Sequence, residues 1–137
     1  MRKKGIDPAA KRLAEHYAQF PDWYWKHGLH DAEILSISEL EFIPDYIEKN
    51  PGFNCLEIAL NSKNAIYERD IQTIRLYNYK IKTPDVKLNC ADKRWWISDA
   101  IKDLNNQQYS LDIEIESASG SRDHFIVEFE IPEIERK

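Results

Sequence analysis

The chain has 137 residues, of which 42% are hydrophobic and 31% charged, so it can bury one core and is not a disordered protein. It carries 19 basic against 24 acidic residues, and this net charge of -5 argues against a general nucleic-acid binder but suits a basic partner or simple solubility. Its apolar runs are too short to cross a bilayer and no signal-peptide core follows the basic N-terminus, so we expect one cytoplasmic domain over residues 1–137.

The N-terminal part is predicted to be helical. Asp7 can accept hydrogen bonds from the amides of a first helical turn, and Pro8 fits the first position of that turn. Leu13, Tyr17 and Phe20 then recur at helical spacing and give the helix one apolar face. We expect this helix to pack on one face of a sheet.

The remainder reads as strands. In residues 32–43 and 71–82, apolar side chains occupy both odd-numbered and even-numbered positions, which indicates a bulge or burial on both faces of the strand. Residues 55–60 instead alternate cleanly. Residues 86–90 alternate as a short strand, and residues 94–104 fit both periodicities but favour a strand. The sequence therefore predicts an α+β fold, with a mostly antiparallel sheet of about five to seven strands and the N-terminal helix on one face.

The end of the chain is predicted to be a hairpin that turns at residues 119–121. We expect Ala118 to lie opposite Arg122, which brings Asp112 opposite Glu128 on the outer face. Water can screen the repulsion between such carboxylates, but an acidic plate can also attract a basic protein. The residues expected to bind such a partner are Asp112, Glu114, Glu116, Glu128 and Glu130.

A histidine and aspartate cluster offers a second reading. His27, His30 and Asp31 could hold a divalent metal ion in a metal-dependent hydrolase, because imidazole and carboxylate groups are its ligands. The structural reading, which we favour, is that these side chains contact backbone groups where the first strand begins. We therefore predict no metal and no cofactor.

The tryptophans offer a third reading, a ligand pocket beside Trp23 or Trp96. Core packing is the better prediction for residues 23–25, yet strand alternation would leave one of Trp95 and Trp96 on the outer face as an interface anchor. Cys55 and Cys90 lack CxxC spacing, so we expect two buried, reduced thiols.

Three segments carry a resemblance: HGLHDAEILSI at residues 27–37, RWWISDAI at residues 94–101, and the closing hairpin YSLDIEIES to DHFIVEFEI. This pattern resembles small bacterial proteins of unassigned function and some immunity proteins of polymorphic toxin systems. The long N-terminal helix and the helical spacing of Ile97, Ile101 and Leu104 depart from it. The resemblance implies a sheet protein without catalytic residues. We expect a non-enzymatic inhibitor that covers a basic toxin, with the metal-dependent hydrolase as the alternative.

Overall fold

A computed structural model describes residues 21, 23–25, 29–40, 54–65, 69–89 and 91–137. The strands in this part of the chain are β1 (Ala32–Leu40), β2 (Cys55–Asn61), β3 (Ile71–Tyr77), β4 (Lys80–Ile81), β5 (Arg94–Asn105), β6 (Gln108–Ser117), β7 (Arg122–Phe129) and β8 (Ile131–Arg136). They form one sheet in the order β4-β7-β6-β5-β1-β2-β3-β8, and every pairing is antiparallel.

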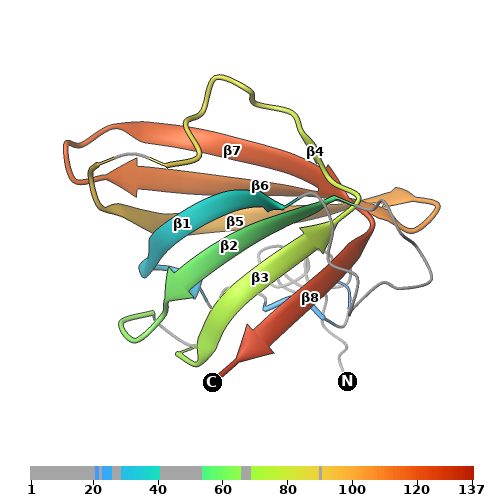
Figure 1. Ribbon diagram of the computed structural model, residues 1–137, viewed down its shortest axis with the longest axis horizontal. Helices are drawn as coiled ribbons and strands as arrows, with labels where there is room; N and C mark the ends of the chain where they lie inside the picture. The colour runs from blue at the N-terminus through green and yellow to red at the C-terminus, as the bar shows by residue number, and fades with distance from the viewer. Residues whose placement is uncertain (1–20, 22, 26–28, 41–53, 66–68, 90) are drawn as a thin grey trace, which may run out of the picture.

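The sheet curves until its two ends meet, because two pairs of consecutive strands, β3 with β4 and β7 with β8, bend at the same place. β3 continues into β4 and β7 into β8, and the register that places Ile74 opposite Ile134 is the same one that places Ile81 opposite Val127. Asn78 adopts a positive φ of 54° at the corner, a conformation that asparagine tolerates better than most residues. Figure 1 shows the result, with β5, β6 and β7 lying over a second layer of β1, β2, β3 and β8.

The core lies between these two layers. Alternate residues of each long strand point inward, and they are almost all apolar. The largest side chains that are fully buried there include Trp96, Phe125, Phe129, Ile58, Ile74 and Leu111. Burial of each such side chain contributes about 1.5 to 3 kcal/mol. A sheet folded in this way buries its inner face against itself.

The predicted α+β class is wrong, because the described residues form an antiparallel sheet without an α-helix. The helix expected over residues 9–20 lies outside the described residues. The predicted strand number is also too low, since two segments that each read as one strand bend at the corner: residues 71–82 into β3 and β4, and the last strand of the hairpin into β7 and β8. No helix in the described part of the chain is long and apolar enough to span a membrane.

Several local predictions are confirmed. β1 has a register shift between Ile34 and Ser36, which is the bulge that was one of the two explanations expected for its two sets of apolar positions. Residues 94–104 belong to a strand rather than a helix. The inward residues of β2, Leu56 and Ile58, are fully buried as its alternation predicted.

The strand predicted over residues 86–90 is wrong for residues 86–89, which form a loop, and Cys90 lies outside the described residues. The Arg94 guanidinium holds this loop by donating to the carbonyl oxygens of Lys87, at 2.8 Å, and Leu88. The Asn89 amide accepts from the Ile37 N–H at 3.1 Å and donates to its carbonyl oxygen at 2.8 Å. The loop thus uses side chains where a strand would use its backbone.

The hairpin register also differs from the prediction. Arg122 lies opposite Glu116 rather than Ala118, so every predicted pair is displaced by two residues. The Gly120 N–H donates to the Ser117 carbonyl oxygen at 2.9 Å, and Gly120 has a φ of 94°. This geometry places the glycine last in a three-residue loop, whereas the prediction placed it in the middle. A shift of two residues leaves each side chain on its expected face.

Candidate functional site

The predicted acidic residues of the hairpin do not oppose one another. Asp112 lies opposite Ile126, and Glu114 lies opposite His124, so the predicted pairing of Asp112 with Glu128 is wrong. The Arg122 guanidinium instead makes ion pairs with Glu114 at 2.9 Å and with Glu116 on the same strand. The corrected register therefore converts an expected repulsion into a set of cross-strand attractions.

These contacts stabilise the charged forms of the hairpin side chains. A hydrogen bond from the Ser98 hydroxyl, together with the Arg122 guanidinium, lowers the pKa of Glu114. The Asp112 carboxylate lies 2.8 Å from Nδ1 of His124, and this hydrogen bond raises the pKa of the imidazole. Three carboxylates, those of Asp112, Glu114 and Glu116, thus share one guanidinium and one titratable imidazole. We call these three residues the acidic face, and it retains an excess of negative charge.

The other two predicted residues lie apart from the acidic face. Glu128 points outward from β7, with Ser110 on one side of it and Lys80 on the other as register partners. Glu130 lies at the corner between β7 and β8, where its carboxylate accepts from Asn78 at 2.5 Å and from Gln108 at 3.5 Å. The structure therefore brings together three of the five predicted residues.

A groove adjoins the acidic face around Trp95. This half-buried side chain lies on the outer face of β5, with Glu33 of β1 and Glu116 of β6 as its register partners on either side. The groove has a volume of about 590 Å³ and is lined by these three side chains together with Asp31 and Ile97, among others. Trp96 is fully buried, so the prediction that one of the two tryptophans faces outward is confirmed.

Asp99 is a partly buried carboxyl group that the sequence reading missed. A register shift between Trp96 and Ser98 turns both Trp96 and Asp99 toward the core. The indole N–H groups of Trp96 and Trp25 donate to Oδ2 of Asp99 at 2.5 Å and 3.0 Å. Burial raises the pKa of Asp99 to about 8, although the two donors stabilise its charged form. The sequence signal for this inward position was the spacing of Asp99 and Ile101, because residues two apart in a strand lie on the same face of the sheet.

The histidine and aspartate cluster forms part of the junction at the start of β1. His30 Nδ1 lies 3.2 Å from Oδ1 of Asp31, and both side chains are about half exposed. The Asp31 N–H donates to the Trp96 carbonyl oxygen at 2.7 Å, which fixes this junction to β5. His27 lies outside the described residues. Across the described residues no group of three or more His, Cys, Asp or Glu side chains could hold a metal ion.

The aromatic residues before β1 pack into the core, as predicted. Tyr24 and Trp25 are 5% and 4% exposed, and the Trp25 ring meets that of Trp96 edge to face at 5.4 Å. Trp23 is partly buried and makes edge contacts with the rings of Tyr109 and Phe129. The Trp96 ring is fully packed, which argues against a ligand pocket beside it, whereas Trp23 is only partly buried.

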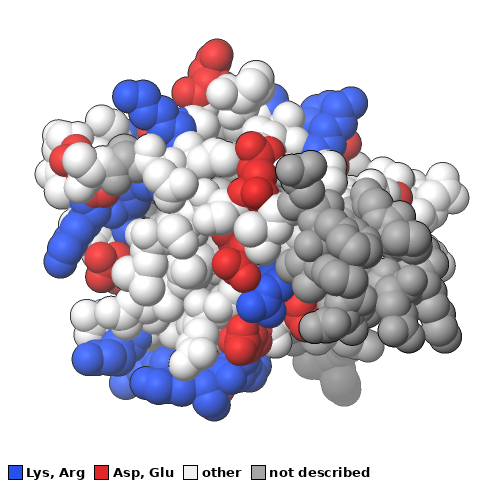
Figure 2. Space-filling view, in the orientation of Figure 1, with Lys and Arg blue, Asp and Glu red and all other residues white. Residues whose placement is uncertain are grey.

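The layer of β1, β2, β3 and β8 carries mixed charges. Figure 2 shows uncharged side chains across the middle of its described surface, with Lys and Arg gathered along the margins. Asp and Glu side chains also lie along the middle of this surface, with a Lys or Arg side chain among them. The described part of this side therefore mixes both charge signs.

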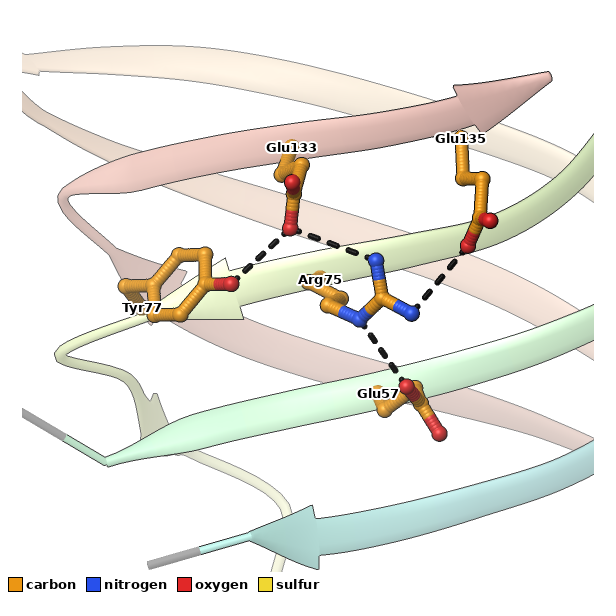
Figure 3. A network of polar contacts seen from close by, with 5 residues as sticks. All are labelled: Glu57, Arg75, Tyr77, Glu133 and Glu135. Atoms are coloured by element: carbon orange, nitrogen blue, oxygen red, sulfur yellow. Dashed lines mark hydrogen bonds and ion pairs between the residues drawn. The ribbon is translucent and has the colours of Figure 1, made fainter. Parts of the chain in front are cut away.

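An ion-pair network crosses this second layer (Figure 3). The Arg75 guanidinium contacts Glu57 at 2.9 Å, Glu133 at 3.3 Å and Glu135 at 3.1 Å. Tyr77 donates its hydroxyl proton to Glu133 at 2.9 Å, and burial together with this bond raises the pKa of Tyr77. The network links β2, β3 and β8 and leaves the guanidinium mostly covered, which indicates a structural role.

Cys55 packs beside this network. Its side chain is fully buried, as predicted, and the thiol is free. Burial raises the pKa of Cys55 to about 11, so the thiol stays protonated at neutral pH. A protonated, covered thiol is a poor nucleophile, and this favours the expected structural role.

Comparison of the chain with protein-family models, with curated proteins and with solved structures finds no match.

Proposed function

We propose that this protein is a non-enzymatic interaction domain that binds a basic protein partner through its acidic face. The main observation behind this proposal is the excess of carboxylates on the acidic face, where Asp112, Glu114 and Glu116 share a single guanidinium. Complementary charge accelerates association with a basic partner and selects against acidic ones. The ion pairs also hold the carboxylates in fixed positions before binding, which lowers the entropy lost on association.

The specific form of this proposal is an immunity-type inhibitor that covers a basic toxin in the cytoplasm. The resemblance of the His-Asp junction, the tryptophan-rich strand and the closing hairpin to immunity proteins supports it. The free thiol of Cys55 suits a reducing compartment. Inhibition by covering a surface needs no catalytic group, which is consistent with a role for the acidic face.

The test uses proteins encoded beside this chain's coding region. Each is expressed alone, and one that arrests growth is expected to be neutralised when this protein is expressed with it. The purified pair should bind with an affinity that falls as salt is added. Growth arrest that persists despite co-expression, with no binding by the purified proteins, would contradict the proposal.

A charge variant tests the surface. The triple variant Asp112→Asn, Glu114→Gln and Glu116→Gln removes three negative charges and should weaken binding tenfold or more, about 1.4 kcal/mol. The control variant Asn54→Lys, Gln72→Lys and Gln107→Lys changes the net charge by the same amount at three exposed residues that do not belong to the acidic face. Equal weakening by both variants would show that net charge, rather than this face, governs binding.

A further inference from the structure

The groove at Trp95 combines an aromatic ring with negative charge. Glu33, Trp95 and Glu116 lie side by side as register partners on three neighbouring strands. Adjacent strands are about 4.8 Å apart, so the two carboxylate-bearing residues flank the indole at roughly 10 Å from each other. A planar group laid over the ring would thus have a carboxylate on each side.

The charges that line the groove are all negative. Among its described lining residues are three carboxylates, those of Asp31, Glu33 and Glu116, and no lysine or arginine. Glu116 is paired with Arg122 at 3.1 Å and Asp31 lies beside His30. Glu33 has no ion pair with any residue that the structure describes. One carboxylate next to the indole is therefore available to a cation.

The indole itself is accessible from the groove. Trp95 is half-buried, and no residue in the described part of the chain accepts a hydrogen bond from its indole N–H. Ile97 adds an apolar wall, whereas Asp31 and Glu116 keep 52% and 36% of their side chains exposed. An aromatic surface with carboxylates around it is the chemistry that binds an organic cation.

We propose that this groove binds an arginine side chain of the basic partner. The guanidinium stacks on the Trp95 indole and donates two hydrogen bonds to the Glu33 carboxylate. Arginine fits better than lysine because its planar head can make both contacts at once, whereas an ammonium acts as a point charge. The inference rests on the proposed function, since it names the anchor by which the partner is held beside the acidic face.

The test follows the indole N–H resonances of the intact protein during titration with the peptide acetyl-Gly-Arg-Gly-amide. The chain has four tryptophans, and the Trp95→Phe variant identifies which of the four signals belongs to Trp95. We expect that signal to shift and to saturate with a dissociation constant of about 1 to 10 mM, which combines the cation–ring contact with the two hydrogen bonds to Glu33. The matching lysine peptide should bind more weakly.

Two comparisons make the result decisive. A citrulline peptide has nearly the shape of the arginine peptide without its charge and should give no saturable shift. Glu33→Gln should weaken binding fivefold or more, whereas the control Glu128→Gln removes one charge outside the groove and should leave the affinity unchanged. Equal shifts with citrulline, no movement of the Trp95 signal, or unchanged affinity in Glu33→Gln would each overturn the inference.

The peptide titration is independent of any partner protein, so its outcome separates the two proposals. Arginine binding that depends on Glu33, combined with failure of the growth test, would retain the groove and reject the immunity role. Neutralisation of a toxin that is unchanged by Glu33→Gln and Trp95→Phe would retain the role and reject the groove as its anchor.

Discussion

Nε1 of the Trp96 indole lies 2.5 Å from Oδ2 of Asp99, and the Trp25 indole donates to the same oxygen at 3.0 Å. The contact joins the segment before β1 to the middle of β5. It places an ionisable group beside the core, where its protonation state affects stability.

Stability should fall as the pH rises through the range in which Asp99 ionises. The folded-state pKa of about 8 exceeds the usual value of 3.8, so the folded protein holds the proton more tightly than the unfolded chain. The contribution of Asp99 is thus fully present below about pH 4 and is lost as the pH rises to about 8. Urea unfolding at pH 5 and pH 8 should show a difference of about 1 kcal/mol or more that is absent in Asp99→Asn. If the free energy of unfolding changed equally between pH 5 and pH 8 in the parent protein and in Asp99→Asn, the raised pKa of Asp99 would be refuted.

The pKa of His124 should lie above its usual 6.5 and should depend on Asp112, whose carboxylate accepts its hydrogen bond. This pair stabilises the fold at low pH, and its contribution is lost as the pH rises through the folded-state pKa. NMR titration should find a lower His124 pKa in Asp112→Asn than in the parent protein. A larger decrease in Glu116→Gln would instead support the register expected from the sequence, in which Glu116 lies opposite His124.

Removal of Arg75 should destabilise the fold by about 2 kcal/mol, since three partly buried glutamates lose their shared partner. Urea unfolding of Arg75→Met measures this loss. The control is Arg136→Met, because Arg136 pairs with Asp70 at 2.7 Å while both side chains stay about half exposed. That variant should lose less than about 1 kcal/mol. Similar losses in both variants would contradict a special role for the network.

Gly120→Ala should destabilise the hairpin through backbone conformation alone. Nothing lies within 4 Å of an added Cβ, but the φ of 94° is unfavourable for alanine by about 1 to 2 kcal/mol. Thermal unfolding should show a smaller loss for Gly120→Asn, because asparagine tolerates positive φ better. A more stable Gly120→Ala variant would mean that the loop does not need this conformation.

Cys55 should react slowly with a thiol reagent until the protein unfolds. A pKa of about 11 and full burial both reduce the reactive thiolate. In a Cys90→Ser background, labelling at pH 8 should be about 100-fold or more slower in buffer than in denaturant. Comparable rates in the two solutions would show that the thiol is accessible.

The sequence by itself determined which face many side chains occupy. Alternation predicted the buried faces of β2, β6 and β7 correctly, and it predicted that Trp95 and Trp96 face opposite sides of the sheet. Alternation is a property of the strand backbone, so it needs no knowledge of the neighbouring strands.

Only the tertiary structure decided which residues lie opposite one another. A register shift of two residues keeps every side chain on its face, so the hydrophobic pattern could not separate Glu116 from Ala118 as the partner of Arg122. The conformation of Gly120 in the loop made that choice. The corner at Asn78 likewise closes the sheet through pairing between segments about 50 residues apart, and that closure leaves the groove at Trp95 on the outside and Asp99 beside the core.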